Sequence, residues 1–342
     1  REEGSYSLEK GRTFYTSNAG LKDLKMEFCN YLMRRFDVEY DYNKEVMVTV
    51  GGSEAIDIAL RAMLNPGDEV LIPQPSYVSY TPCTILADGV PVTIQLEEKD
   101  KFRLTKEKLL EKITPKTKVL VLPFPNNPTG SIMRRGELEA VAEVLRGTDI
   151  MIISDEIYSE MTYGGEKHVS IAEIDGMRER TIVVNGFSKT YAMTGWRLGY
   201  CAGPKPVMKQ MLKLHQYCIM SSPTVSQYAA ITALTQCRDD VDRMLEEYDM
   251  RRRLVVKGFN DMGLTCFEPE GAFYVFPCIK STGMKSSEFC EKLIYSKKVA
   301  VVPGSAFGES GEGYVRVSYA YSVQHITTAL QRIKEFVEEL KK

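Results

Sequence analysis

The most reactive group in the sequence is the amine of Lys189, which follows the apolar stretch TIVVNGF at residues 181–187. An amine at the end of a buried strand is desolvated, and desolvation lowers the pKa of a lysine. A lysine with a lowered pKa can attack a carbonyl carbon as a nucleophile. The alternative is a lysine in a surface loop, so the interpretation depends on the residues that accompany Lys189.

A second candidate group is the carboxylate of Asp155, which follows the apolar run IMIIS at residues 150–154. A buried carboxylate requires a cationic partner or strong hydrogen bonds. A pyridinium nitrogen would be such a partner, and the carboxylate would keep that ring protonated and electron-withdrawing. Tyr158 could offer its phenol to an oxygen on the same ring. The alternatives are a helix N-cap for Asp155 and a core position for Tyr158.

Other residues could bind anions. Gly51, Gly52 and Ser53 precede a helix, where backbone N–H groups and the positive end of the helix dipole suit a phosphate. Arg197 could hold the same phosphate through its planar guanidinium. Arg316 lies inside the alternating stretch YVRVSYAY, where an inward-facing arginine would need an anion such as a substrate carboxylate. The alternatives are an ordinary N-cap turn and arginines that face water.

These residues are expected at one edge of a parallel sheet. Ligands of such sheets bind beyond the carboxyl ends of the strands, where these side chains occur. Uninterrupted apolar strands separated by helices are typical of a parallel sheet covered by helices on both faces, which is an α/β fold. Tyr77 follows another strand and could either stack on a planar ring or pack in the core. The expected strands lie within residues 45–50, 69–73, 91–96, 118–125, 150–156 and 181–187.

The residues after Arg197 follow a different pattern. A long amphipathic helix is expected at 238–263, and short strands mixed with helices come after it. A chain of 342 residues is long enough for two domains at about 150 residues each. We therefore expect a large domain over residues 15–250 and a smaller α+β domain made of residues 1–14 and 251–342, with the long helix bridging them.

The composition favours a small-molecule partner. A net charge of −2 provides no basic field for nucleic acid or for an anionic membrane. The three histidines are far apart and form no His-Glu-x-x-His pattern, so no metal site is expected. Most of the eight cysteines are expected to be reduced. With no signal peptide or long apolar span in the sequence, we expect a cytoplasmic protein.

Several segments together carry a resemblance to a known family: NNPTG (126–130), SDEIY (154–158), SKTYAMTGWRLGY (188–200) and YVRVSYA (314–320). In this combination the chain resembles the class I and II aminotransferases, which are pyridoxal 5'-phosphate enzymes of fold type I. It is most similar to the aspartate and aromatic aminotransferases of bacteria. The resemblance implies ping-pong transfer of an amino group, through a Schiff base, from an aspartate-like, aromatic or broader range of L-amino acids to a 2-oxo acid such as 2-oxoglutarate.

The resemblance also implies roles for single residues. Lys189 corresponds to the lysine that forms the Schiff base and transfers the proton of the substrate Cα. Asp155 corresponds to the partner of the pyridine nitrogen. Tyr158 and Asn127 correspond to the pair that hydrogen-bonds the phenolic oxygen of the ring, and Tyr77 takes the place of an aromatic residue stacked on that ring.

The remaining implied contacts involve the phosphate, the substrate and a second subunit. Arg316, together with Asn127, corresponds to the site of the substrate α-carboxylate. Tyr15 corresponds to a tyrosine that reaches the site of the neighbouring subunit, which implies a homodimer. Further residues expected to bind the cofactor are Gly52, Ser53, Glu54, Ser188 and Arg197.

The chain departs from the family pattern in three places. No Gly-x-Gly-Glu-Pro-Asp motif precedes GRTFYTSNAG, so REEGSYSLEKG is expected to be a truncated end or two pieces separated by a gap. Gly186 stands where many relatives have a phosphate-binding serine, and Ser188 could substitute for it. Ser53 stands where some aspartate enzymes have a lysine that reads the side-chain carboxylate. The last departure favours aromatic or broad specificity over a preference for dicarboxylates.

Three other functions are alternatives. A β-eliminating carbon–sulfur lyase of the same fold would use the same lysine. A regulatory domain that binds the cofactor without turnover is disfavoured by the absence of a basic DNA-binding module and by the complete set of site residues. A nicotinamide-dependent dehydrogenase is disfavoured because no Gly-x-Gly-x-x-Gly follows any expected strand.

Overall fold

The larger part of the molecule is built around one seven-stranded sheet, in a computed structural model that describes residues 1–340. The strands are β1 (Val46–Thr49), β2 (Glu69–Gln74), β3 (Val90–Gln95), β4 (Thr117–Leu122), β5 (Met151–Asp155), β6 (Thr181–Gly186) and β7 (Gly199–Ala202). Their spatial order is β1-β7-β6-β5-β4-β2-β3. The strands from β3 to β6 pair in parallel, and β7 pairs antiparallel with both of its neighbours, β1 and β6. The expected α/β fold with a mostly parallel sheet is therefore confirmed.

Helices cover both faces of this sheet, because its strands are apolar on both sides. The helices are α2 (Lys22–Phe36), α3 (Gly51–Met63), α4 (Tyr80–Leu86), α5 (Lys106–Lys112), α6 (Arg135–Leu145), α7 (Lys205–Cys218) and α8 (Thr224–Gln236). Val70 and Ile72 of β2 pack with α3, α4 and α7, whereas Leu71 between them packs with α5 and α6 on the other face. Helices α2 and α8 cover β1, β6 and β7 on that second face.

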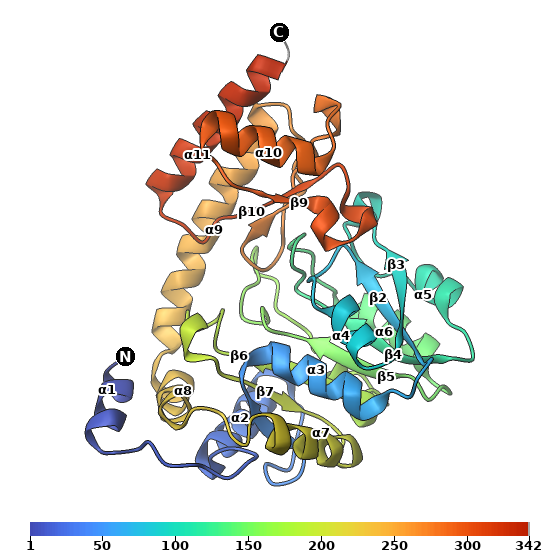
Figure 1. Cartoon of the computed structure of the whole chain (residues 1–342), viewed down its shortest axis with the longest axis vertical. Coiled ribbons are helices and arrows are strands. Elements are labelled where there is room, and N and C mark those ends of the chain that lie inside the picture. The colour runs from blue at the N-terminus through green and yellow to red at the C-terminus, as the bar shows by residue number, and fades with distance from the viewer. Residues whose placement is uncertain (341–342) are drawn as a thin grey trace.

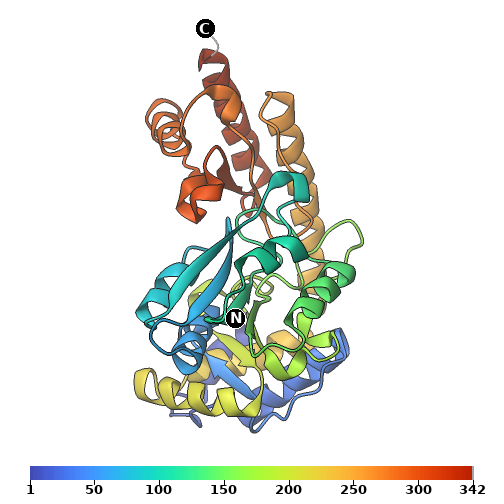
Figure 2. The same ribbon diagram turned by 90° about the vertical axis from the view of Figure 1, so that its right-hand side faces the viewer.

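The smaller part of the molecule contains a three-stranded sheet in the order β8-β10-β9. Its elements are β8 (Tyr274–Val275), α10 (Ser286–Lys297), β9 (Val302–Pro303), β10 (Val315–Ser318) and α11 (Val323–Leu340). The long helix α9 (Arg238–Asp261) joins the two parts and ends just before Gly263, which has a positive φ (Figures 1 and 2). Because α9 extends into both parts, the domain boundary near residue 250 stays a prediction.

The N-terminal helix α1 (Glu2–Glu9) lies beside the larger part, which differs from the expectation that residues 1–14 join the smaller domain (Figure 1). Helix α1 packs against α8. A Cβ atom at Gly4 would come within 2.5 Å of the ring of Trp196, so the helix backbone approaches this side chain closely. The guanidinium of Arg12 lies 4.3 Å from the ring centroid of Tyr228. These contacts hold residues 1–14 against the larger part of the molecule. No local sequence pattern predicts them.

Short 3₁₀ helices complete the structure at Glu98–Asp100, Ile171–Glu173, Arg178–Arg180, Thr194–Trp196, Lys280–Thr282, Gly304–Phe307 and Glu309–Gly311. Among residues 1–340, no helix has both the length and the apolar character that crossing a membrane requires. The eight cysteines are all free thiols. The carboxyl ends of β4, β5 and β6 point toward the space between the two parts, which is where the candidate site lies.

Candidate active site

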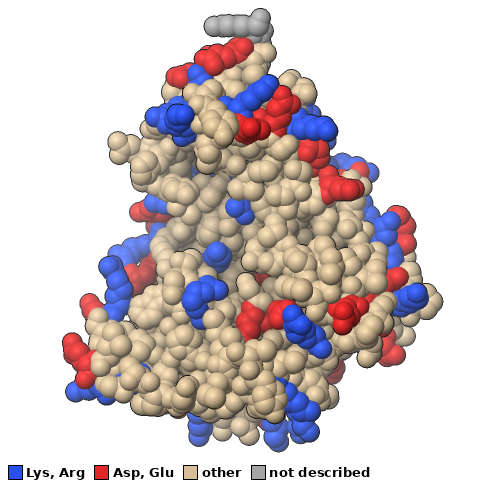
Figure 3. All heavy atoms as spheres, in the orientation of Figure 1, with Lys and Arg blue, Asp and Glu red and all other residues tan. Residues whose placement is uncertain are grey.

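A cavity of about 290 Å³ lies at the carboxyl edge of the large sheet. In the space-filling view, a few Lys and Arg atoms lie in and beside a hollow between the upper and lower parts of the molecule (Figure 3). Most of the predicted site residues line this cavity: Gly52, Ser53, Tyr77, Asn127, Asp155, Tyr158, Ser188, Lys189, Arg197 and Arg316. The tertiary structure therefore brings together side chains that are spread over most of the sequence.

Asp155 ends β5 and is only 8% exposed. Its Oδ2 accepts a hydrogen bond from the hydroxyl of Tyr80 at 2.6 Å, and its Oδ1 accepts one from the backbone N–H of Ile157 at 3.2 Å. Burial raises the pKa of Asp155, and the Tyr80 and Ile157 hydrogen bonds oppose that rise. A cation that enters the cavity would favour the ionised form of this carboxylate.

Lys189 follows β6 and is half-buried. Its Nζ lies 6.0 Å from the ring centroid of Tyr158 and 5.8 Å from that of Phe273. Burial lowers the pKa of Lys189, the positive charges of Arg316 and Arg197 lower it further, and the charge of Asp155 opposes them. The amine is therefore neutral at a lower pH than an ordinary lysine, as a nucleophile requires.

The first turn of α3 and Arg197 form a cradle for an anion. Gly51 has a φ of +78°, and a Cβ atom there would lie 3.0 Å from Nη2 of Arg197. A Cβ atom at Gly52 would lie 3.3 Å from a methyl group of Val184. With no side chains at these two positions, the N–H groups at the start of α3 and the guanidinium of Arg197 face the same cavity. This combination fits a phosphate group.

Glu54 differs from its expected role in cofactor binding, because the structure turns its carboxylate away from the cradle. Its Oε2 accepts a hydrogen bond from the backbone N–H of Val50 at 2.5 Å. Its Oε1 lies 2.6 Å from Nδ1 of the buried His215. Glu54 thus satisfies an N–H group at the start of α3, where an acidic side chain is favoured by the helix dipole.

A serine at position 186, as many relatives have, would be crowded here, because a Cβ atom would lie 3.0 Å from the Cα of Gly199 on the paired strand β7. Ser188, two residues later, lines the cavity instead. Its position agrees with the expectation that Ser188 substitutes for the missing serine, although its contact with the cofactor stays a prediction.

On the opposite wall, residues from both parts of the molecule meet. Nη1 of Arg316, on β10, donates to Oδ1 of Asn127 at 2.9 Å. The guanidinium of Arg316 lies 4.5 Å from the ring centroid of Tyr274 and 4.8 Å from that of Phe307. The hydroxyl groups of Tyr158 and Tyr274 lie 3.0 Å apart. Nε of Arg316 is buried without a hydrogen-bond partner among residues 1–340, and the guanidinium lines the cavity, where an anion could pair with it.

Tyr15 does not line the cavity of its own subunit and is 80% exposed. Tyr80 and Tyr274 also line the cavity, although no motif in the sequence indicated them as site residues. The sequence QPSYVSY could have suggested Tyr80, because it lies three residues after Tyr77 and residues three apart share one side of a helical turn. No comparable signal marks Tyr274, which comes from β8 in the smaller part.

A neutralisable lysine, a buried carboxylate and an anion cradle around one cavity suit pyridoxal 5'-phosphate, since each could meet a different part of that molecule. The class of protein is thus a fold type I enzyme that uses this cofactor. The chain belongs to the aminotransferase class I and II family, whose model matches residues 2–333. The protein is accordingly a transaminase that depends on pyridoxal 5'-phosphate.

Named relatives agree with this assignment. The chain is 48% identical to a putative aminotransferase, YugH, of Bacillus subtilis, over 99% of this chain and 88% of the relative. It is 46% identical to an aspartate aminotransferase of Pyrococcus abyssi, over 100% of this chain and 88% of the relative. The crystal structure of an aromatic aminotransferase from Pyrococcus horikoshii superposes with a TM-score of 0.98 at 44% identity, covering 99% and 92% of the two chains. These comparisons do not favour the lyase or regulatory alternatives.

Replacing Tyr80 with phenylalanine should weaken the binding of pyridoxal 5'-phosphate about 10-fold, because a hydrogen bond to a charged group is worth about 1.5 kcal/mol. The hydroxyl of Tyr80 opposes the rise in the pKa of Asp155, so its loss raises that pKa further. A higher pKa means more protonated carboxylate as the pH falls, and the defect should grow toward low pH. Titration of the apoenzyme with cofactor at several pH values measures this effect.

The control for this substitution is Tyr295→Phe on α10, where the side chain is 73% exposed. It should bind the cofactor like the wild type at every pH. Equal affinity of the Tyr80→Phe variant and the control across the pH series would show that the Tyr80 hydrogen bond does not support Asp155.

Proposed function

We propose that the cavity transfers the amino group of an aromatic L-amino acid to a 2-oxo acid such as 2-oxoglutarate, and accepts aspartate less well. The observation that carries this proposal is the placement of Arg316, whose guanidinium lies in the same cavity as Lys189 and Asp155. Among residues 1–340, the Lys and Arg side chains that line the cavity are Lys189, Arg197 and Arg316. Each of them has a proposed partner other than a substrate side chain. Tyrosine, proline and isoleucine side chains supply much of the remaining wall, which suits an aromatic group.

Each site residue then has a distinct task. Bound pyridoxal 5'-phosphate supplies an electron-withdrawing ring, which acidifies the Cα–H bond of the amino acid. The carboxylate of Asp155 would keep a proton on the ring nitrogen, and Tyr158 and Asn127 would donate hydrogen bonds to the phenolic oxygen. Nζ of Lys189 first holds the cofactor, then accepts the proton that leaves the substrate Cα and donates it again.

The remaining contacts hold the phosphate and the substrate. Gly52, Ser53 and Arg197 would hold the phosphate, and Tyr77 would contact the cofactor ring. Arg316 pairs with the α-carboxylate of the amino acid and, in the second half of the reaction, with that of the 2-oxo acid. The same groups thus serve both halves of a ping-pong reaction.

The active unit is proposed to be a homodimer in which Tyr15 reaches the cavity of the partner subunit. Tyr15 is 80% exposed, and the adjacent Phe14 is 54% exposed, which is unusual for two successive aromatic side chains. The backbone oxygen of Phe14 accepts a hydrogen bond from Thr224 at 2.6 Å, so this exposed segment is held in place. The cytoplasmic location expected from the sequence stays a prediction.

A half-reaction screen tests the proposed function. Holoenzyme is mixed with each L-amino acid in the absence of any 2-oxo acid, and the absorbance of the cofactor and the released 2-oxo acid are measured. Tyrosine and phenylalanine should each release one equivalent of 2-oxo acid per subunit, faster than aspartate does. Release of pyruvate and a thiol from cysteine conjugates, without amino transfer, would contradict the proposal in favour of β-elimination.

Replacing Arg316 with alanine should raise the KM for both the amino acid and the 2-oxo acid about 10–100-fold, since a charge-assisted hydrogen bond is worth about 1.5–3 kcal/mol. Steady-state kinetics with both substrates varied measures the effect. The control is Arg332→Ala on the exposed surface of α11, which should keep the wild-type KM values. A KM unchanged for either substrate in the Arg316→Ala variant would remove Arg316 from carboxylate binding.

A further inference from the structure

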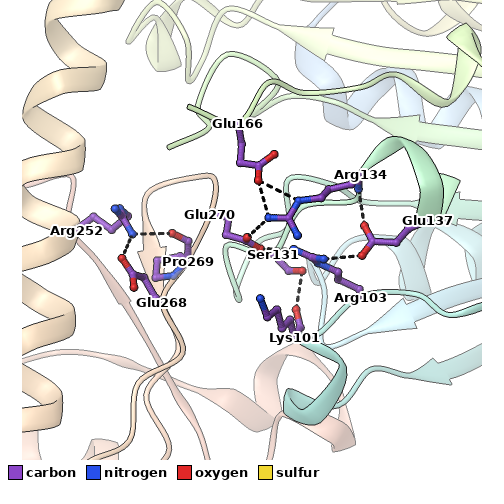
Figure 4. A network of polar contacts seen from close by, with 10 residues as sticks. All are labelled: Lys101, Arg103, Ser131, Arg134, Glu137, Glu166, Arg252, Glu268, Pro269 and Glu270. Atoms are coloured by element: carbon purple, nitrogen blue, oxygen red, sulfur yellow. Dashed lines mark hydrogen bonds and ion pairs between the residues drawn. The ribbon is translucent and has the colours of Figure 1, made fainter. Parts of the chain in front are cut away.

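A network of ion pairs connects the larger part of the molecule with the segment that leads into the small sheet (Figure 4). At its centre is Glu270, whose side chain is 19% exposed. Its Oε2 accepts a hydrogen bond from Nη2 of Arg103 at 2.5 Å, and its Oε1 accepts one from Nη2 of Arg134 at 2.7 Å. Arg103 also pairs with Glu137, and Arg134 with Glu166. We call this group of three residues, Glu270, Arg103 and Arg134, the Glu270 clamp.

Backbone hydrogen bonds attach the same segment to two loops beside the cavity. The N–H groups of Glu270 and Gly271 both donate to the carbonyl oxygen of Gly130, at 2.9 and 2.8 Å. The N–H group of Ala272 donates to the carbonyl oxygen of Met161 at 2.9 Å. Residues 270–272 are therefore joined to the loops that follow β4 and β5, although they lead into the smaller part.

The backbones approach too closely for side chains to separate them. A Cβ atom at Gly130 would lie 2.3 Å from the Cβ of Pro269, and Gly130 also has a φ of +72°. A Cβ atom at Gly271 would lie 2.7 Å from the Cβ of Pro125. With so little space between the segments, a shift of residues 270–272 must displace the loop around Gly130.

The two segments that meet here, the loop around Gly130 and residues 270–272, both lead directly to the cavity. Asn127 lies three residues before Gly130, and Tyr274 lies two residues after Ala272. Asn127 and Tyr274 both contact the guanidinium of Arg316, through a hydrogen bond at 2.9 Å and a ring contact at 4.5 Å, and the ring of Phe307 lies 4.8 Å from the same group. The position of Arg316 therefore depends on how these two segments lie against each other.

We propose that Glu270 is a positioning residue for substrate binding: held by Arg103 and Arg134, it fixes residues 270–272 against the Gly130 loop, so that Asn127 and Tyr274 orient Arg316. This inference rests on the proposed function of Arg316 as the carboxylate site. Glu270 itself does not line the cavity and acts through the residues on either side of the junction.

The substitution Glu270→Gln tests the proposal, because it keeps the shape of the side chain and removes its charge. Binding of 3-phenylpropanoate, an aromatic carboxylate with no amino group, is measured on the holoenzyme through the absorbance of the cofactor. The Kd should rise about 5–10-fold, as expected when charge-assisted hydrogen bonds weaken. The KM for the amino acid should rise by a similar factor, with kcat within about twofold of the wild type and cofactor affinity unchanged.

The matched control is Glu268→Gln, two residues earlier. The Glu268 side chain is 64% exposed and pairs with Arg252 on α9 instead of the clamp (Figure 4). This variant should keep the wild-type Kd and KM. Hydrogen exchange supplies a second readout that needs no turnover: the amides of residues 271 and 272 should exchange faster in Glu270→Gln than in Glu268→Gln.

The outcomes separate the two hypotheses. If Glu270→Gln has the same Kd for 3-phenylpropanoate and the same KM as Glu268→Gln, the positioning role is wrong, whatever its thermal stability. If the wild type binds 3-phenylpropanoate but transfers no amino group, the proposed function fails while the Kd still decides the role of the clamp. If Glu270→Gln does not fold, the shorter Glu270→Asp is measured in the same way, and a wild-type Kd in that variant would overturn the proposal.

Discussion

Replacing Lys189 with alanine should abolish covalent attachment of pyridoxal 5'-phosphate and lower kcat by at least about 10³-fold, because one residue supplies both the attachment and the proton transfer. The lowered pKa of Lys189 makes its amine available below the pH at which ordinary lysines are neutral. Attachment of the cofactor to wild-type apoenzyme should slow as the pH falls through that lowered pKa. Borohydride reduction followed by peptide mapping identifies the attached lysine.

Lys25 provides an internal control for this experiment. It is buried in α2, and burial lowers its pKa as well, yet it lies outside the cavity. If a lowered pKa alone determined attachment, Lys25 would also carry the label. We expect the label on Lys189 alone, and Lys25→Met should keep turnover. Label on any other lysine, or wild-type turnover in Lys189→Ala, would refute the assignment of the catalytic amine.

Replacing Asp155 with asparagine should lower kcat/KM about 10²–10³-fold. The substitution removes the negative charge that would keep a proton on the ring nitrogen, and loss of one partner of a buried ion pair costs about 3–5 kcal/mol. Part of this loss should appear as weaker cofactor binding, because the ion pair also holds the ring in place. Cofactor titration of the apoenzyme and steady-state kinetics at saturating cofactor separate the two contributions.

The control for Asp155→Asn is Asp149→Asn, an exposed position just before β5. It should leave both measurements unchanged. Asp155→Glu should recover part of the activity, since the charge returns at a displaced position. An Asp155→Asn variant within tenfold of wild-type kcat/KM would mean that this carboxylate does not interact with the cofactor ring.

Local sequence was sufficient for much of the fold and for the centre of the site. The apolar strands could be recognised because burial on both faces of a parallel sheet demands uninterrupted runs such as IMIIS. Asp155 and Lys189 could be selected because each directly follows such a strand, and neighbouring parallel strands place their carboxyl ends together. The family resemblance then supplied Asn127, Arg197 and Arg316, all of which line the cavity.

Other features depended on contacts between residues far apart in the chain. Tyr80 meets Asp155 from 75 residues away, and Asn127 meets Arg316 from 189 residues away. Glu54 directly follows the cradle residues in the sequence, but its carboxylate contacts Val50 and His215.

By itself, the sequence determined the parallel sheet, the lysine and the carboxylate at its edge, and the family. These features follow from burial patterns and motifs that lie within a few neighbouring residues. Only the tertiary structure decided that α1 packs on α8, that Tyr80 supports Asp155, and that the Glu270 clamp joins the loops on either side of the Arg316 site. The reason is that packing of the two parts, and not chain adjacency, sets the distances among these groups.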